Sequence, residues 1–216
     1  MATREAALHA IYGAMVQEAT RRLNAATGYL ATFSGSKSAF EVESAVLQLR
    51  KALEAIALAA IAPNKAAYAA FRATATSAPD FTKDYHAQKI FTALERINAN
   101  FYPVALLPAK RMSDGTFHFG RKQTGFLSKK RFQAIYDRLG KYLHTDNPWG
   151  NPKHLNNLAL ELPITIEEAH SLLELHVTFI QTPTVKGAWV IEADRHGGLP
   201  RVIQALASGE FSVKDS

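Results

Sequence analysis

An arginine and a histidine six residues apart, Arg138 and His144, are the residues of this chain whose types and spacing best suit chemistry. An arginine stays charged and can neutralise a phosphoryl oxygen, while a histidine can move a proton near neutral pH. Together they are the minimum set for cleaving RNA without a metal, because the histidine activates a ribose 2′-hydroxyl or protonates the leaving oxygen and the arginine stabilises the transition state. The spacing therefore predicts Arg138 and His144 as a catalytic pair, although two such residues also meet at this separation by chance.

Basic residues gather around this pair. Residues 110 to 144 contain nine Lys or Arg and two acids, so the segment carries +7 while the whole chain carries +6. Aromatic residues are interleaved with these charges, which favours contacts to nucleic acid, and a solvated helix face is the alternative interpretation. The side chains predicted to bind RNA phosphates are Lys130, Arg131, Lys141, Arg121 and Lys122.

Several other chemistries are excluded or disfavoured by the sequence. The chain has no cysteine, which excludes a disulfide framework, a cysteine-bound zinc and a thiol nucleophile. The motifs of phosphate-binding loops, dinucleotide-binding folds, serine hydrolases and zinc proteases are absent. His170 and Glu174 stand four residues apart but lack a third ligand in register. We therefore expect no metal site and no cofactor.

Length and composition indicate one folded domain with room for a small appendage. The 216 residues are 47% hydrophobic and 20% charged, which is enough to bury a core without a disulfide or a metal. No apolar run reaches the roughly 18 residues that a membrane span needs, and the first residues lack the pattern of a secretory signal. We therefore expect a cytoplasmic protein with no membrane contact.

The hydrophobic pattern is mainly helical. Ser38 and Glu41 form a capping-box pattern for one helix, and Ser128 is placed to cap another, in which Leu139 and Leu143 occupy inward positions. Trp149 is expected to pack over the end of that second helix. The predicted helices cover residues 4–33, 38–62, 64–75, 82–98, 128–144, 153–161 and 165–175.

The period changes after residue 175. Residues 176–182 and 187–193 are rich in Val, Ile, Thr, Phe and Trp on either side of a turn, which predicts an antiparallel hairpin. Residues 202–207 fit a third strand or a short helix. The predicted fold is therefore mainly α: an antiparallel helical bundle over residues 1–175, including a basic loop at about 103–127, with a small C-terminal β-hairpin appendage over 176–216 packed on it.

The pattern of Arg138 and His144 on a late helix, an early helix ESAVLQLRKALEAIALAAIA, and antiparallel helices between them resembles the HEPN-domain family. Many members of that family are metal-independent endoribonucleases that work as homodimers, with the two motifs facing each other across the two-fold axis. Many also belong to toxin–antitoxin or antiphage defence modules. The resemblance implies an RNA substrate, a homodimer, and an antitoxin or defence-system partner protein.

Two features of the motif support other interpretations. Leu139 follows Arg138, where active family members commonly have a polar residue, and a six-residue step places Arg138 and His144 about 120° apart on an ideal helix. They converge if the helix distorts near Gly140 or if a dimer completes the site, and otherwise His144 serves as a helix C-terminal cap. A second hypothesis is therefore a catalytically inactive HEPN-like binding or scaffold module, and a third is a small-molecule sensor with its ligand near Trp149 and Trp189.

Overall fold

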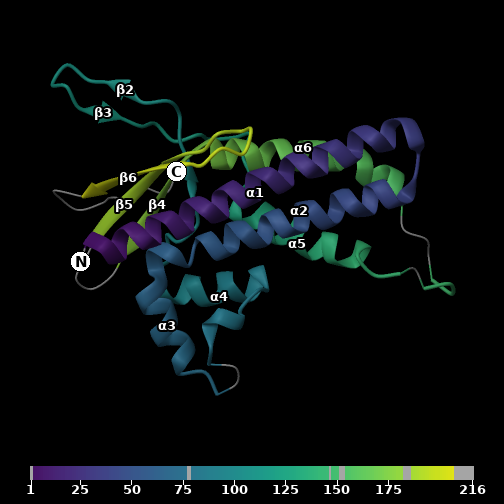
Figure 1. Cartoon of the computed structure of the whole chain (residues 1–216), viewed down its shortest axis with the longest axis horizontal. Coiled ribbons are helices and arrows are strands. Elements are labelled where there is room, and N and C mark those ends of the chain that lie inside the picture. Colours follow the sequence, from purple (N-terminus) through teal and green to yellow (C-terminus); the bar gives the residue numbers. More distant parts are fainter. Residues whose placement is uncertain (1, 77–78, 146, 151–153, 182–185, 207–216) are drawn as a thin grey trace.

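The computed structural model describes residues 2–76, 79–145, 147–150, 154–181 and 186–206, and within them the fold is mainly α (Figure 1). The α-helices are α1 (Ala2–Ser36), α2 (Ala39–Ala59), α3 (Lys65–Ala73), α4 (Ala87–Ile97), α5 (Lys129–Tyr142) and α6 (Leu155–Glu174). Two short 3-10 turns are η1 (Ala62–Asn64) and η2 (Phe81–Lys83). The strands are β1 (Val104–Ala105), β2 (Lys110–Arg111), β3 (Phe117–His118), β4 (Leu175–Gln181), β5 (Lys186–Glu192) and β6 (Arg201–Leu206).

The centre of the molecule is a pair of long helices, α1 and α2, that lie side by side (Figure 1). α1 continues through Gly13 and Gly28 without a break. α2 buries Leu49, Leu53 and Ile56 almost completely. Its second half is apolar on nearly all sides, so it can pack against α1, α4, α5 and α6 at once.

One end of this helix pair rests on a four-stranded antiparallel sheet with the order β1-β4-β5-β6. The sheet is larger than the hairpin that the sequence predicted, because β1 from the middle of the chain pairs with β4 and residues 201–206 form a strand. Alternate side chains of a strand point to opposite faces. Trp189 and Ile191 accordingly join the main core, whereas Val177 and Val190 pack in a second cluster with Leu106.

The first turns of α1 are fixed to this sheet by polar and aromatic contacts. The Tyr12 hydroxyl and His176 Nε2 lie 2.8 Å apart, and His176 Nδ1 lies 3.0 Å from the Leu173 carbonyl oxygen. The ring of His9 meets the Trp189 ring edge-on at 4.4 Å between centroids. His176 is thus a buried structural residue, as a lone histidine at the start of a strand usually is.

Two predicted helix boundaries were wrong. α6 runs through Pro163 as one helix where the sequence predicted two, because Leu162 and Ile166 are buried on either side and their packing offsets the one lost backbone hydrogen bond. The helix predicted over 82–98 begins at Ala87, and residues 81–83 form η2 instead, with the Asp80 carboxylate accepting from Thr82 N–H at 3.0 Å.

Three local predictions were also wrong. Ser38 caps α2 without a side-chain hydrogen bond, so the capping box is not formed. α5 ends at Tyr142, which leaves Leu143 38% exposed in the following turn instead of buried. Trp149 is 91% exposed and does not pack over the end of α5. The Ser128 cap is confirmed, since its side chain accepts from Arg131 N–H.

Candidate functional site

Arg138 lies on the flank of α5 that faces α6, where its guanidinium makes a two-pronged ion pair with Glu161. Nη1 donates to Oε2, and Nη2 donates to Oε1 at 3.2 Å. The hydrogen bond to Glu161 raises the pKa of Arg138, and the hydrogen bond from Arg138 lowers the pKa of Glu161. Arg138 therefore stays fully charged, but its charge is matched by a carboxylate of the same chain.

His144 lies two residues beyond the end of α5, where its side chain is exposed. It lines a hollow of about 380 Å³ together with Lys141, and also a second hollow of about 360 Å³ that Phe40 and Leu47 line on the α2 side. Arg138 is not among the residues that line either hollow. The structure thus places His144 beside Lys141 and on a different flank from Arg138.

We call the cavity of about 380 Å³ the His144 hollow. The residues that line it are Arg50, His86, Tyr136, Asp137, Gly140, Lys141, Leu143 and His144.

The residues predicted to bind phosphates fall into two groups. Arg131 forms an ion pair with Glu168, and the Lys122 ammonium donates to the carbonyl and hydroxyl oxygens of Ser171, both at 3.0 Å. Arg121 is half-buried in a bridge with Leu106. Lys130 and Lys141 are exposed, and neither forms an ion pair within the described part of the chain. Three of the nine cations of residues 110–144, Lys122, Arg131 and Arg138, therefore hold this segment to α6.

Arg50 of α2 shapes the wall of the His144 hollow. Its Nη1 donates to the Tyr136 carbonyl oxygen at 2.9 Å, and its guanidinium carbon lies 3.9 Å from the centre of the Tyr136 ring. Its Nε lies 3.4 Å from Glu54 Oε1. A Cβ on Gly140 would meet Arg50 Nη1 at 2.8 Å, so the glycine in the last turns of α5 gives the guanidinium its room.

Tyr136 and His86 also line the His144 hollow. The Tyr136 hydroxyl donates to Glu54 Oε1 at 3.0 Å and accepts from Ala87 N–H at 3.4 Å. Burial, reinforced by Glu54, raises the pKa of Tyr136 to about 12, so the phenol keeps its proton at neutral pH. The His86 ring meets the Tyr136 ring edge-on at 5.5 Å, and the buried His86 Nδ1 has no hydrogen-bond partner among the described residues.

Sequence reasoning missed Arg50 and His86. A signal for Arg50 was present, because it stands with Glu54 at a four-residue spacing directly before the apolar second half of the helix. A charged pair at such a place indicates a specific partner across the helix face. No comparable signal marked His86, whose position depends on the irregular segment before α4.

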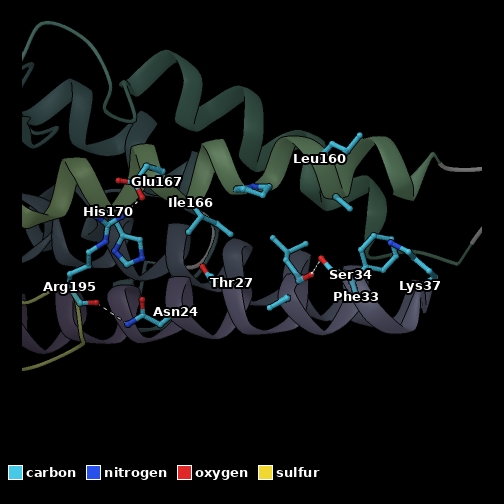
Figure 2. Close-up of a pocket in the computed structure, with 14 residues that line it drawn as sticks. Asn24, Thr27, Phe33, Ser34, Lys37, Leu160, Ile166, Glu167, His170 and Arg195 are labelled. Carbon is cyan, nitrogen blue, oxygen red and sulfur yellow. Dashed lines mark hydrogen bonds and ion pairs between the residues drawn. The ribbon is translucent and has the colours of Figure 1, made fainter.

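A larger hollow, of about 660 Å³, lies between α1 and α6 (Figure 2). Leu30 and Ile166 form apolar walls, and His170 is 4% exposed at its floor. Burial and the nearby Arg195 lower the pKa of His170 to about 4, so this imidazole is neutral at pH 7. Glu174, four residues along, forms an ion pair with Arg195 at 3.2 Å. Among the described residues there is no group of three or more His, Asp or Glu that could hold a metal ion.

Comparison with known proteins does not indicate a function for this chain. No family model, no curated protein and no solved structure matches this chain. In the described part of the chain, no helix combines the length and the apolar character needed to cross a bilayer.

Proposed function

We propose that this protein is a metal-independent endoribonuclease of the HEPN type and that the His144 hollow holds the phosphodiester it cleaves. One observation carries the proposal. Two imidazoles, His86 and His144, and two cations, Arg50 and Lys141, line the same hollow at the end of α5. An imidazole pair can both accept and donate a proton near neutral pH, and the cations can bind the phosphate between them.

The proposed reaction uses the ribose hydroxyl as the nucleophile. His144 takes the proton of the 2′-hydroxyl, the 2′-oxygen attacks phosphorus, and the bond from phosphorus to the 5′-oxygen breaks. His86 returns a proton to the leaving 5′-oxygen. The products are a 2′,3′-cyclic phosphate and a 5′-hydroxyl, while Lys141 and Arg50 stabilise the negative charge of the transition state.

Arg138, the arginine that the sequence predicted as catalytic, takes part in the proposed reaction under one condition. Its two-pronged pair with Glu161 has to open before the guanidinium can reach a phosphate. A dianionic transition state competes well with a single carboxylate for a guanidinium, so the exchange is chemically reasonable. Arg138 is then a third cation, beside Arg50 and Lys141, and RNA recruits it.

The test is cleavage of a fluorogenic RNA by the purified protein in EDTA. His144→Ala should lower the rate by about 10² to 10⁴, because a proton carrier is lost, and Arg138→Ala by about a hundredfold if RNA recruits it. Lys130→Ala is the matched control, since it removes an exposed cation of α5 outside the hollow and should weaken RNA binding only modestly. Equal activity in the wild type and in His144→Ala would reject the proposed chemistry, as would products without cyclic phosphate ends.

The second candidate is a catalytically inactive binding or scaffold module for a protein or nucleic-acid partner. The ion pairs of Arg138 with Glu161 and of Arg131 with Glu168 favour it, because they use the cations of α5 within the fold. Undetectable cleavage together with salt-sensitive RNA binding, or a stable complex with another protein, would support this candidate. A homodimer, and a place in a toxin–antitoxin or antiphage module with its partner protein, are proposed from the resemblance alone, and light scattering tests the first.

A further inference from the structure

A groove of about 670 Å³ between α3 and α4 has an unusual charge balance. Three cations line it, Arg72, Lys89 and Arg96, and no Asp or Glu lies among its described lining residues. Apart from Phe71, the rest of the lining is polar or small: Thr74, Ala75, Thr76, Gln88, Thr92 and Ala93. A concave surface with one sign of charge concentrates ligands of the opposite sign.

Two of these cations form a row along α4. Lys89, Thr92 and Arg96 stand at positions i, i+3 and i+7, so they share one helix face. At 1.5 Å of rise per residue, Lys89 and Arg96 are separated by about 10.5 Å along the helix axis. Both side chains are exposed, and neither forms an ion pair with any residue that the structure describes. Their charges are therefore available to a ligand.

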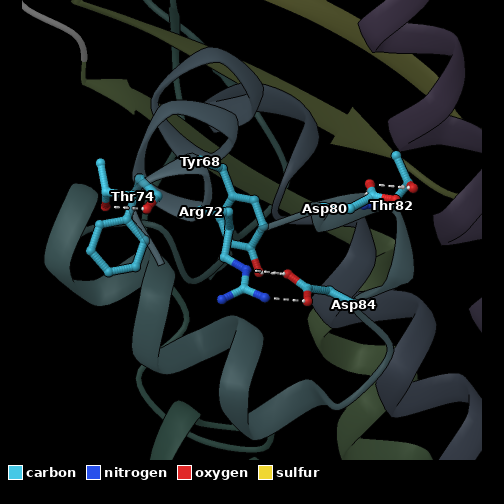
Figure 3. Close-up of polar contacts among 7 residues, drawn as sticks. Tyr68, Arg72, Thr74, Asp80, Thr82 and Asp84 are labelled. Atoms are coloured by element: carbon cyan, nitrogen blue, oxygen red, sulfur yellow. Dashed lines mark hydrogen bonds and ion pairs between the residues drawn. The ribbon is translucent and has the colours of Figure 1, made fainter. Parts of the chain in front are cut away.

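The opposite wall is held in place by a polar cluster (Figure 3). Arg72 donates to Asp84 through Nε at 2.9 Å and through Nη2 at 3.0 Å, and the Tyr68 hydroxyl donates to the same carboxylate at 2.8 Å. This cluster fixes the last turns of α3 against the segment that follows η2. The charge of Arg72 is matched by Asp84, so the net positive charge of the groove comes from Lys89 and Arg96.

The groove adjoins the His144 hollow at the start of α4. Gln88 lines the groove, and its Nε2 lies 3.5 Å from Oδ2 of Asp137, which lines the hollow. His86, the residue directly before α4, lines the hollow from the same segment. A chain that leaves the hollow across Gln88 thus enters the groove beside Lys89.

We infer that the groove between α3 and α4 binds the backbone phosphates of single-stranded RNA next to the phosphodiester held in the His144 hollow. The identity of the occupant rests on the proposed function, whereas the affinity for a phosphate backbone rests on the lining of the groove. A single strand suits the site because its backbone can follow a narrow positive groove, whereas duplex RNA is recognised by proteins across its wide minor groove.

The experiment measures binding separately from cleavage. The probe is a fluorescein-labelled 2′-O-methyl oligouridylate of about ten nucleotides, which lacks the attacking hydroxyl and is long enough for a site of this kind. Its fluorescence anisotropy is followed in EDTA over a series of salt concentrations. Lys89→Ala/Arg96→Ala is compared with the wild type and with Lys83→Ala/Arg201→Ala, which removes the same charge from two exposed positions outside the groove.

Loss of two phosphate contacts should lower affinity roughly tenfold at physiological salt and reduce the slope of log K against log salt by about 1.4, because each contact to a single strand releases about 0.7 of a counterion. The control variant should retain the wild-type slope. The dinucleotide UpA, which is too short to reach the groove, should be cleaved equally by the wild type and by the groove variant.

The outcomes separate the two proposals. Equal affinity and equal slope in the groove variant and the wild type would overturn the inference, even if RNA cleavage is found. An equal loss in the groove and control variants would also overturn it, since net charge alone would then explain binding. Groove-dependent binding without cleavage of UpA or longer RNA would support the inference and reject the proposed function.

Discussion

Replacing Gly140 by alanine tests whether the Arg50 contact organises the His144 hollow. On helix propensity alone, Gly140→Ala should stabilise α5 by roughly 0.5–1 kcal/mol, because glycine loses the most backbone entropy on folding. The structure reverses this expectation. The new Cβ would lie 2.8 Å from Arg50 Nη1, which is too close for any non-bonded contact, whereas its 3.6 Å distance to Arg50 Cζ is an ordinary contact.

The guanidinium is the far end of a flexible side chain, so Arg50 would yield, and its displacement would act on the contacts that it makes. Its displacement would break the charged hydrogen bond to the Tyr136 carbonyl, worth about 1.5–3 kcal/mol, and weaken the contact with the Tyr136 ring, worth about 0.5–1 kcal/mol. These losses exceed the gain in helix propensity. We therefore expect Gly140→Ala to lower the free energy of unfolding by about 1–2 kcal/mol.

Urea denaturation followed by circular dichroism measures this change, and a double-mutant cycle with Arg50→Ala isolates its cause. In the Arg50→Ala background the clash is absent, so Gly140→Ala should become stabilising by about 0.5–1 kcal/mol. The change of sign is the decisive result. Stabilisation by Gly140→Ala in the wild-type background, or the same destabilisation in both backgrounds, would refute the assignment of Gly140 as the residue that makes room for Arg50.

Three further outcomes are expected. Burial lowers the pKa of His176 to about 4, below the ordinary value of 6.5 in the unfolded chain. The contribution of His176 to stability is therefore fully present above pH 6.5, and the free energy of unfolding should fall by roughly 3 kcal/mol as the pH is lowered to 4. Unfolding measured at several pH values checks this, and His176→Gln should depend less on pH than the wild type. Asp84→Asn should destabilise the fold by roughly 1–3 kcal/mol, because it removes the charge that Arg72 and Tyr68 share; thermal melts with Asp80→Asn as the exposed control measure it. Glu161→Gln removes the carboxylate that pairs with Arg138, so the rate of RNA cleavage should rise in this variant. Adding Arg138→Ala should return the rate to the wild-type level or below. An unchanged rate in Glu161→Gln would contradict the recruitment of Arg138 by RNA.

Local sequence patterns predicted which helices and strands form more reliably than they predicted the residues at which these elements begin and end. The inward positions of α5 were predicted from spacing, and Leu139 is fully buried as expected. Leu143 continues the same spacing, but α5 ends one residue earlier and the last position turns outward. Hydrophobic periodicity shows which face is buried and does not show at which turn the backbone leaves the helix.

Pro163 illustrates how tertiary packing outweighs a strong local signal. A proline inside a helix costs about 3 kcal/mol, and the sequence therefore predicted a break there. In the structure the neighbouring turns bury Leu158, Leu162, Ile166 and Ala169, and this burial offsets the cost of the proline within one helix. Such an outcome depends on the partners of α6, which the local sequence does not reveal.

The candidate site was predictable only in part for a related reason. His144 and Lys141 are close in sequence, so spacing alone could group them. Arg50 reaches Tyr136 across 86 positions of sequence, and Glu161 reaches Arg138 across 23. Charge counting along residues 110–144 could not anticipate that acids of other helices would match three of these cations, Lys129, Arg131 and Arg138.

The contact between Tyr12 and His176 also bears on the order in which the chain folds. These residues are separated by 164 positions, so the first turns of α1 gain their polar anchor only after β4 has left the ribosome. The turn between α1 and α2 closes a short loop and can form early, whereas the strands that support the start of α1 follow all six helices in the chain. Until then the side of Tyr12 that meets His176 and Trp189 stays uncovered, and this interval is when a chaperone or an aggregation partner would meet the chain.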